Sequence, residues 1–172
     1  KIGQAFSVTR ERIRQIEKIA LSKLRRTLEN TKLSEVVKLA LELLAARGGL
    51  CVENELVSEI LKRLSETSDV DGSIVKLALT ISPEFTFSQK NGLLHPYWRL
   101  KNVNEEDLIA ICDAIHHVLS KKKDLAPAAE LTAEVETHLT EKDRTVSRDT
   151  LVALFVIDMR FKRVKEGIGL MS

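Results

Sequence analysis

The chain has 172 residues, of which 44% are hydrophobic and 30% are charged, and its formal net charge is +2. This composition is typical of a folded, water-soluble protein and differs from that of disordered chains. No apolar run reaches the roughly 20 residues that a membrane span needs, so we expect a cytoplasmic protein without a membrane partner. Cys51 and Cys112 lie far apart without a metal-ligand spacing, which argues against a disulfide framework and a zinc site.

The charges are unevenly distributed along the chain. Residues 1–26 contain eight Lys and Arg against two Glu, whereas residues 27–120 contain nine basic and fourteen acidic residues. Residues 121–172 are nearly balanced, with ten basic and nine acidic residues. A basic end on an acidic or neutral body predicts that this end contacts a polyanion such as nucleic acid.

Residues 1–26 predict the end of one helix, a turn and a second helix. Residues 2–6 have helical spacing, a break follows at 7–8, and Thr9 is a suitable N-cap for the second helix. Apolar residues of the second helix lie within about 80° of one another on a helical wheel. They are Ile13, Ile16, Ala20 and Leu24. Basic and hydrogen-bonding residues occupy the opposite side.

A polar break is expected at 27–32, and helices are then expected over 33–47, 55–64 and 73–81. Gly48 and Gly49 end the first of these helices, and a short extended piece follows at 50–52. Apolar residues alternate on both sides of Asn91-Gly92 between 85 and 100, which predicts a β-hairpin.

The same order of elements recurs in the second half of the chain. Helices are expected over 104–120, over 128–139 and from 147, followed by a hairpin between 159 and 171. Residues 77–85 align with 153–161 after a shift of 76 residues, which indicates an internal repeat of roughly 70–75 residues. Phe85 and Phe161 then occupy equivalent positions, and we expect both to be buried.

These patterns predict a mainly α fold with three parts. A helix-turn-helix is expected over 1–26, and two winged-helix units are expected over 33–101 and 104–172. Each unit contains three helices and a β-hairpin.

The string Val8-Thr9-Arg10-Glu11-Arg12-Ile13-Arg14-Gln15-Ile16-Glu17 resembles the recognition helix in region 4 of bacterial RNA polymerase sigma factors of the housekeeping type. The resemblance covers about the first 26 residues. It implies that the helix enters the major groove of the upstream promoter element. By matching positions, it implies that Arg10, Glu11, Arg14 and Gln15 face the bases and that Thr9, Arg12 and Lys18 lie near phosphates.

The side-chain chemistry agrees with this resemblance. Arg donates two hydrogen bonds to guanine, Glu accepts one from cytosine, and Gln pairs with adenine. Such groups must share one side of a helix near its N-terminus, because that end reaches the groove floor. The alternative is a solvated, charged helix packed on its neighbours.

The chain also departs from the sigma pattern. Region 4 lies at the C-terminus of housekeeping sigma factors, whereas about 146 residues follow it here. We expect sequence-specific binding of double-stranded DNA in bacterial transcription initiation or regulation. The alternative is the DNA-targeting or protein-interaction tail of a larger bacterial protein that is not a sigma factor. A structural protein and an enzyme are the remaining classes, and neither a P-loop nor a nucleophile elbow points to catalysis.

The two units offer further candidate surfaces. The third helix of the first unit carries only Lys76 in acidic surroundings, so we expect this unit to contact a protein, RNA polymerase or another. The wing of the second unit is basic and either contacts DNA phosphates or is a solvated edge strand; its residues are Arg160, Lys162, Arg163 and Lys165. No cofactor or metal is expected, because the histidines are scattered and residues 69–72 lack the further ligands of a calcium loop.

Overall fold

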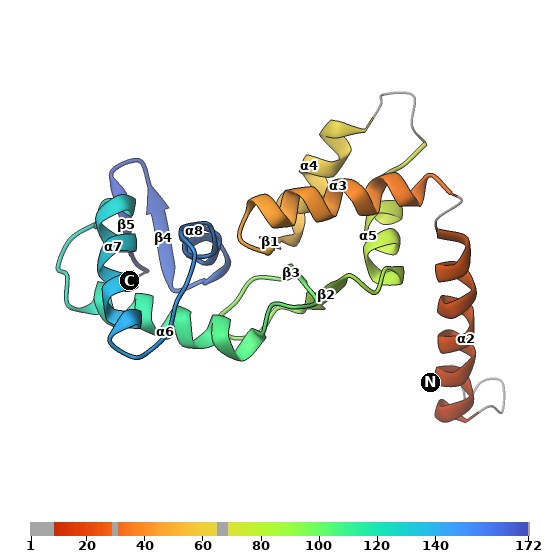
Figure 1. Ribbon diagram of the computed structural model, residues 1–172, viewed down its shortest axis with the longest axis horizontal. Coiled ribbons are helices and arrows are strands. Elements are labelled where there is room, and N and C mark those ends of the chain that lie inside the picture. Colours follow the sequence, from red (N-terminus) through yellow and green to blue (C-terminus); the bar gives the residue numbers. More distant parts are fainter. Residues whose placement is uncertain (1–8, 29–30, 65–68, 172) are drawn as a thin grey trace.

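The structure is a computed structural model that describes residues 9–28, 31–64 and 69–171. Seven helices and five short strands lie in these residues, so the mainly α prediction is confirmed. Helix α2 (Arg10–Leu28) stands at one end of the molecule, unit 1 (residues 33–101) lies in the middle and unit 2 (104–171) lies at the far end (Figure 1). The first predicted helix and the turn at 7–8 fall outside the described residues.

Unit 1 contains three helices and a three-stranded antiparallel sheet in the order β1-β3-β2. Its elements are α3 (Leu33–Ala46), β1 (Leu50–Val52), α4 (Glu53–Arg63), α5 (Gly72–Ile81), β2 (Phe85–Ser88) and β3 (Tyr97–Leu100). Helix α3 forms because its apolar residues recur at helical spacing, and Val36, Ala40 and Leu44 are fully buried. Trp98 on β3 packs into the same core.

Unit 2 repeats this order with a smaller sheet. Its elements are α6 (Glu105–Ser120), α7 (Ala128–Thr140), α8 (Arg148–Ile157), β4 (Phe161–Val164) and β5 (Gly167–Leu170). An isolated bridge between Ala126 and Ile168 occupies the place that β1 has in unit 1. Helices α6 and α7 pack against each other around Ile115, Leu131 and Val135.

The described residues agree with the repeat in detail around the third helices. The N-cap of α5 is Asp71, which accepts from Ile74 N, and the N-cap of α8 is Ser147, which accepts from Thr150 N. These caps are 76 residues apart. Phe85 and Phe161, also 76 residues apart, are both buried, as predicted. The assignment of each unit as a winged helix stays a prediction.

Most helix ends differ from the prediction by one or two residues, and two differences matter for the packing. Helix α2 continues to Leu28, into the expected break. The first hairpin is shorter than expected, because β3 begins at Tyr97 and Leu94 instead forms a bridge with Asp158 of unit 2. The Asn91 side chain accepts from the amides of Leu93 and Leu94, both at 2.8 Å, and thereby turns this segment away from β2.

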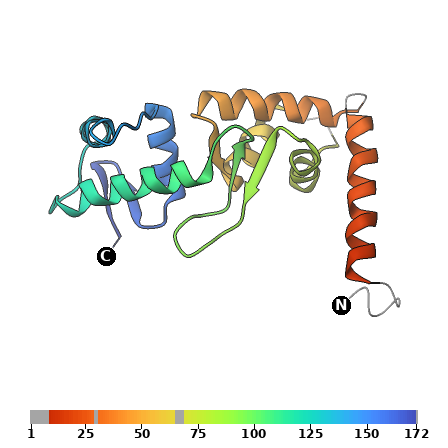
Figure 2. The ribbon, with the colours of Figure 1, turned by 60° about the horizontal axis from the view of Figure 1, so that its bottom comes forward.

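The two units are packed against each other. The two units lie side by side, and helix α8 contacts β1 (Figure 2). The hydroxyl of Thr150 on α8 donates to the carbonyl of Gly48 at 3.1 Å. The segment between β2 and β3 reaches unit 2, where the amide of His95 donates to Ile157 O and that of Met159 to Leu93 O, at 2.9 and 2.8 Å. None of the described helices has the length and apolarity to cross a membrane.

Candidate nucleic-acid interface

Helix α2 begins at the cap that the sequence predicts. Thr9 Oγ1 accepts a hydrogen bond from Arg12 N at 3.2 Å, and Thr9 O accepts one from Ile13 N at the same distance. A capped start fixes the first helical turn, because the cap satisfies an amide that the helix itself leaves unpaired. The helix therefore begins directly at the first residues expected to reach the groove.

The polar side chains of the first two turns contact one another. Arg14 donates to Glu11 through Nε at 3.1 Å and through Nη2 at 2.9 Å. Gln15 Nε2 lies 3.5 Å from Glu11 Oε1, and Arg12 Nη1 lies 3.5 Å from Gln15 Oε1. The structure therefore brings three of the four predicted base-facing residues into one hydrogen-bonded group.

This group keeps its charges and is accessible to a ligand. The Arg14 guanidinium lowers the pKa of Glu11, and the Glu11 carboxylate raises the pKa of Arg14. Both side chains are more than half exposed, at 59% and 71%. Ion pairs in solvent are weak and exchange readily for other partners. The bonds within the group can therefore be replaced by bonds to base edges.

The other predicted contact residues lie around this group. Arg10 and Lys18 are exposed and form no ion pair within the part of the chain that the structure describes. Thr9 precedes the helix, and Arg12 lies in its first turn. All seven positions thus fall within ten consecutive residues at the N-terminal end of α2.

The apolar side of α2 is largely exposed. Ile16, Ile19 and Leu24 are 51%, 52% and 42% exposed, and Leu28 is the buried residue of the helix. Ile13 is half-buried. The described residues of the body therefore leave most of this apolar side uncovered.

The structure gives Arg160 a role other than the predicted phosphate contact. Its Nη2 lies 2.8 Å from Asp158 Oδ2 and 3.2 Å from Asp113 Oδ1, and its guanidinium lies over the Phe161 ring. The Asp158 side chain is entirely shielded from solvent. Because a buried carboxylate needs a compensating partner, Arg160 is engaged inside unit 2.

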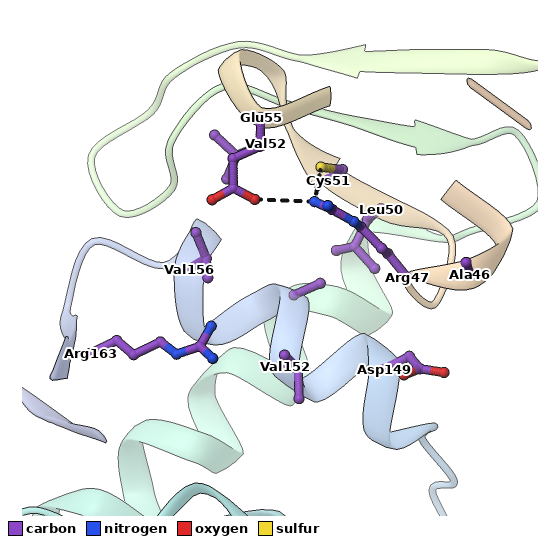
Figure 3. A pocket seen from close by; sticks show the side chains of 11 residues that line it. Ala46, Arg47, Leu50, Cys51, Val52, Glu55, Asp149, Val152, Val156 and Arg163 are labelled. Atoms are coloured by element: carbon purple, nitrogen blue, oxygen red, sulfur yellow. Dashed lines mark hydrogen bonds and ion pairs between the residues drawn. The ribbon is translucent and has the colours of Figure 1, made fainter. Parts of the chain in front are cut away.

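The remaining basic residues of the wing stay available. Lys162, Arg163 and Lys165 are exposed on β4 and the turn that follows it. Arg163 extends toward a cavity of about 280 Å³ between β1 and α8 (Figure 3). On the opposite wall, Arg47 Nη1 lies 3.2 Å from both Glu55 Oε2 and Cys51 Sγ.

Unit packing brings α8 and the segment after β2 into contact with the other unit. Helix α8 faces β1 and the cavity, while its Val152 stays 40% exposed. The segment after β2 is bonded to Ile157 and Met159 of unit 2. Sequence patterns could not reveal this, because the packing joins residues far apart in the chain.

No metal centre emerges from the described residues. A search of them finds no group of three or more His, Cys, Asp or Glu side chains placed to hold an ion. Asp71, in the weak calcium-loop string, serves as the N-cap of α5. His117 and His138 stack with their ring centroids 5.0 Å apart on α6 and α7, and Lys121 is the first cause of the lowered pKa of His117.

Comparison with known proteins yields one match. Residues 1–26 match the model of the family Sigma-70, region 4. This match supports a DNA-binding helix-turn-helix of the kind that acts in transcription. No curated protein and no solved structure matches the chain.

Proposed function

We propose that this chain binds double-stranded DNA sequence-specifically by placing the N-terminal half of α2 in the major groove. The observation that carries this proposal is the group formed by Glu11, Arg14 and Gln15 beside Arg10 on the free end of a capped helix. Base edges in the major groove accept from Arg and donate to Glu, and Gln does both. The family match over residues 1–26 supports the same helix as the reading element.

The proposed setting is bacterial transcription in the cytoplasm, with recognition of a promoter element as the specific role. The chain acts in it by binding and not by catalysis. RNA polymerase is the proposed protein partner. Unit 1 is the proposed contact surface, because its residues 33–101 contain nine acidic against eight basic residues and Lys76 on α5 is paired with Glu53, so the unit presents little positive charge to DNA.

A second candidate function is supported by the packing of the body. The units form a joined block that follows the reading helix, with α8 directed inward. Such a block fits the DNA-targeting or protein-interaction part of a larger protein that is not a sigma factor. Both functions share the DNA-reading helix and differ in what the block contacts.

The wing of unit 2 is a proposed second contact. Lys162 and Lys165 lie at the opposite end of the molecule from α2, so they would meet only a duplex long enough to reach them (Figure 1). The contact would be with phosphates and independent of sequence, since a short wing with lysines presents charge and not a base-specific pattern.

The test of the DNA proposal separates base reading from charge. Arg14→Ala is expected to cost about 1–3 kcal/mol on the preferred duplex and to relax the preference at one base pair. Lys23→Ala, the matched control, removes an exposed charge farther along α2 and is expected to weaken all duplexes alike. Binding is measured on the preferred and a scrambled duplex across a salt series. Equal losses of Arg14→Ala on both duplexes would contradict base reading.

A further inference from the structure

Helix α2 is fixed to unit 1 through its C-terminal turns. Of its 19 residues, Leu28 is the buried one, and the helix contacts α5. Arg25 Nε donates to the carbonyl oxygen of Ile81, at 2.6 Å. The N-terminal half of α2 stands clear of unit 1 in both views (Figures 1 and 2).

The acceptor of this bond is the carbonyl oxygen of Ile81, the last residue of α5. Carbonyls of a final helical turn have no partner within the helix and favour a nearby cation. Helix α5 has no basic residue in its own last turn. The guanidinium of Arg25 therefore supplies from α2 both the donor and the positive charge that the end of α5 lacks.

The same carbonyl position is used again in unit 2. Ile157, the last residue of α8, lies 76 residues after Ile81. Its carbonyl accepts from His95 N of unit 1 at 2.9 Å. In both units, the last carbonyl of the third helix thus receives a donor from the preceding part of the chain. We call the contact made by this last carbonyl the joint; in unit 1 the joint is the hydrogen bond between Arg25 and Ile81.

Arg25 also lies on the DNA-reading side of α2. It follows Arg14 by eleven residues, close to three turns of about 3.6 residues, so both side chains leave the same side of the helix. A duplex read by Arg14 therefore lies on the side of α2 that faces unit 1, about 16 Å along the helix axis from the joint. How the joint holds α2 then decides where the duplex lies relative to the body.

We propose that Arg25 is a positioning residue that holds α2, and with it the bound duplex, at a fixed orientation to unit 1 through the carbonyl of Ile81. The part that concerns the duplex rests on the proposed function. On the sequence alone, Arg25 would be assigned to a DNA phosphate, because it belongs to the basic side of the helix.

The experiment measures the distance between spin labels at Ile16→Cys on the apolar side of α2 and Ser58→Cys on α4. Arg25→Met removes the donor and the charge, Arg26→Met removes the neighbouring exposed charge as a matched control, and Arg25→Lys restores a donor. Distances are recorded without DNA and with the preferred duplex. Trp98 fluorescence through urea unfolding verifies that unit 1 stays folded.

Arg25→Met is expected to broaden the distance distribution about two-fold or more, because α2 would then lose its hydrogen bond to α5. Arg26→Met is expected to match the unaltered protein, and Arg25→Lys to fall between them. Both methionine variants are expected to bind the duplex with affinities within about two-fold of each other.

Equal widths of the distance distribution for the two methionine variants would overturn the proposal. A selective loss of DNA affinity at unchanged width would also overturn it and make Arg25 a DNA contact. If neither the unaltered protein nor any variant bound the duplex, the proposed function would fail. The distances measured without DNA would still decide the role of Arg25.

Discussion

The environment of Asp158 explains why Arg160 is bound inside unit 2, although the sequence groups it with the basic residues of the wing. In the sequence, Arg160 stands beside Lys162, Arg163 and Lys165, and nothing local separates it from them. The structure buries Asp158 and places Arg160 over it. The burial of Asp158 depends on how α6 packs against α8 and on the bridge between Asp158 and Leu94, which a local charge pattern does not contain.

Arg160→Met is expected to lower the free energy of unfolding by about 3 kcal/mol, because it leaves a buried carboxylate without its partner. Lys162→Met is the control, since Lys162 is exposed two residues away, and a change within about 0.5 kcal/mol is expected. Urea unfolding followed by circular dichroism measures both. Equal small losses would show that Asp158 needs no cation.

At the level of elements, the helices were predictable because their signals are local. The spacing of Val36, Ala40 and Leu44 and the caps at Asn104 and Ser147 lie within a few residues of the helices they define. The hairpin in unit 1 was predicted less well. The segment around Leu94 alternates like a strand, yet it bonds to unit 2, and this choice depends on a partner far along the chain.

The two equivalent caps offer a prediction about the third helices. Asp71→Ala and Ser147→Ala are each expected to cost about 1 kcal/mol, because each leaves an amide of the first turn unpaired. The losses should add in the double variant, since the caps belong to separate helices. Ser73→Ala is the control within α5, where the exposed Ser73 serves no cap. Urea unfolding measures the free energy of unfolding of each variant. A cap variant that is as stable as Ser73→Ala would contradict the cap assigned to that residue.

The wing of unit 2 offers a prediction about the second contact. The double variant Lys162→Gln, Lys165→Gln is expected to reduce the slope of log affinity against log salt by about 1.8 on a long duplex, as for two phosphates. On a duplex that covers only the α2 site, the slope should not change. An unchanged slope on the long duplex would identify β4 as a solvated edge strand.

For the whole molecule, the repeat was visible in the sequence and the packing of its copies was not. Leu50, Leu94 and Tyr97 of unit 1 belong to the same core as Leu151 and Ile157 of unit 2. Their apolar character predicts burial but does not specify which unit buries them. The proposed DNA-reading positions on α2 were accessible to sequence analysis because they follow one another on a single helix. The joint at Arg25 was not accessible, because its acceptor is a backbone carbonyl 56 residues away.

Gly48 provides a test of the unit junction. Its φ is +76°, and a Cβ at this position would lie 2.4 Å from Thr150 N. Gly48→Ala is therefore expected to cost about 2 kcal/mol or more, from backbone strain and from displacement of α8. Gly92→Ala is the control, because a Cβ there meets nothing within 4 Å. Thermal and urea unfolding compare the two variants, and a neutral Gly48→Ala would mean that the units are not closely joined there.

Because α2 is attached to unit 1 by its last turns, the proposed DNA preference and the stability of the fold depend on different residues. Residues 10–20 of this helix are largely in solvent, so replacing them alters few contacts that stabilise the units. If the proposed function holds, substitutions at Arg10, Glu11, Arg14 or Gln15 change the preferred DNA sequence without requiring compensating changes in the core. The proposed target preference and the fold stability can then diverge independently during evolution, and a designer can exchange the first turns of α2 while keeping the remainder of the chain.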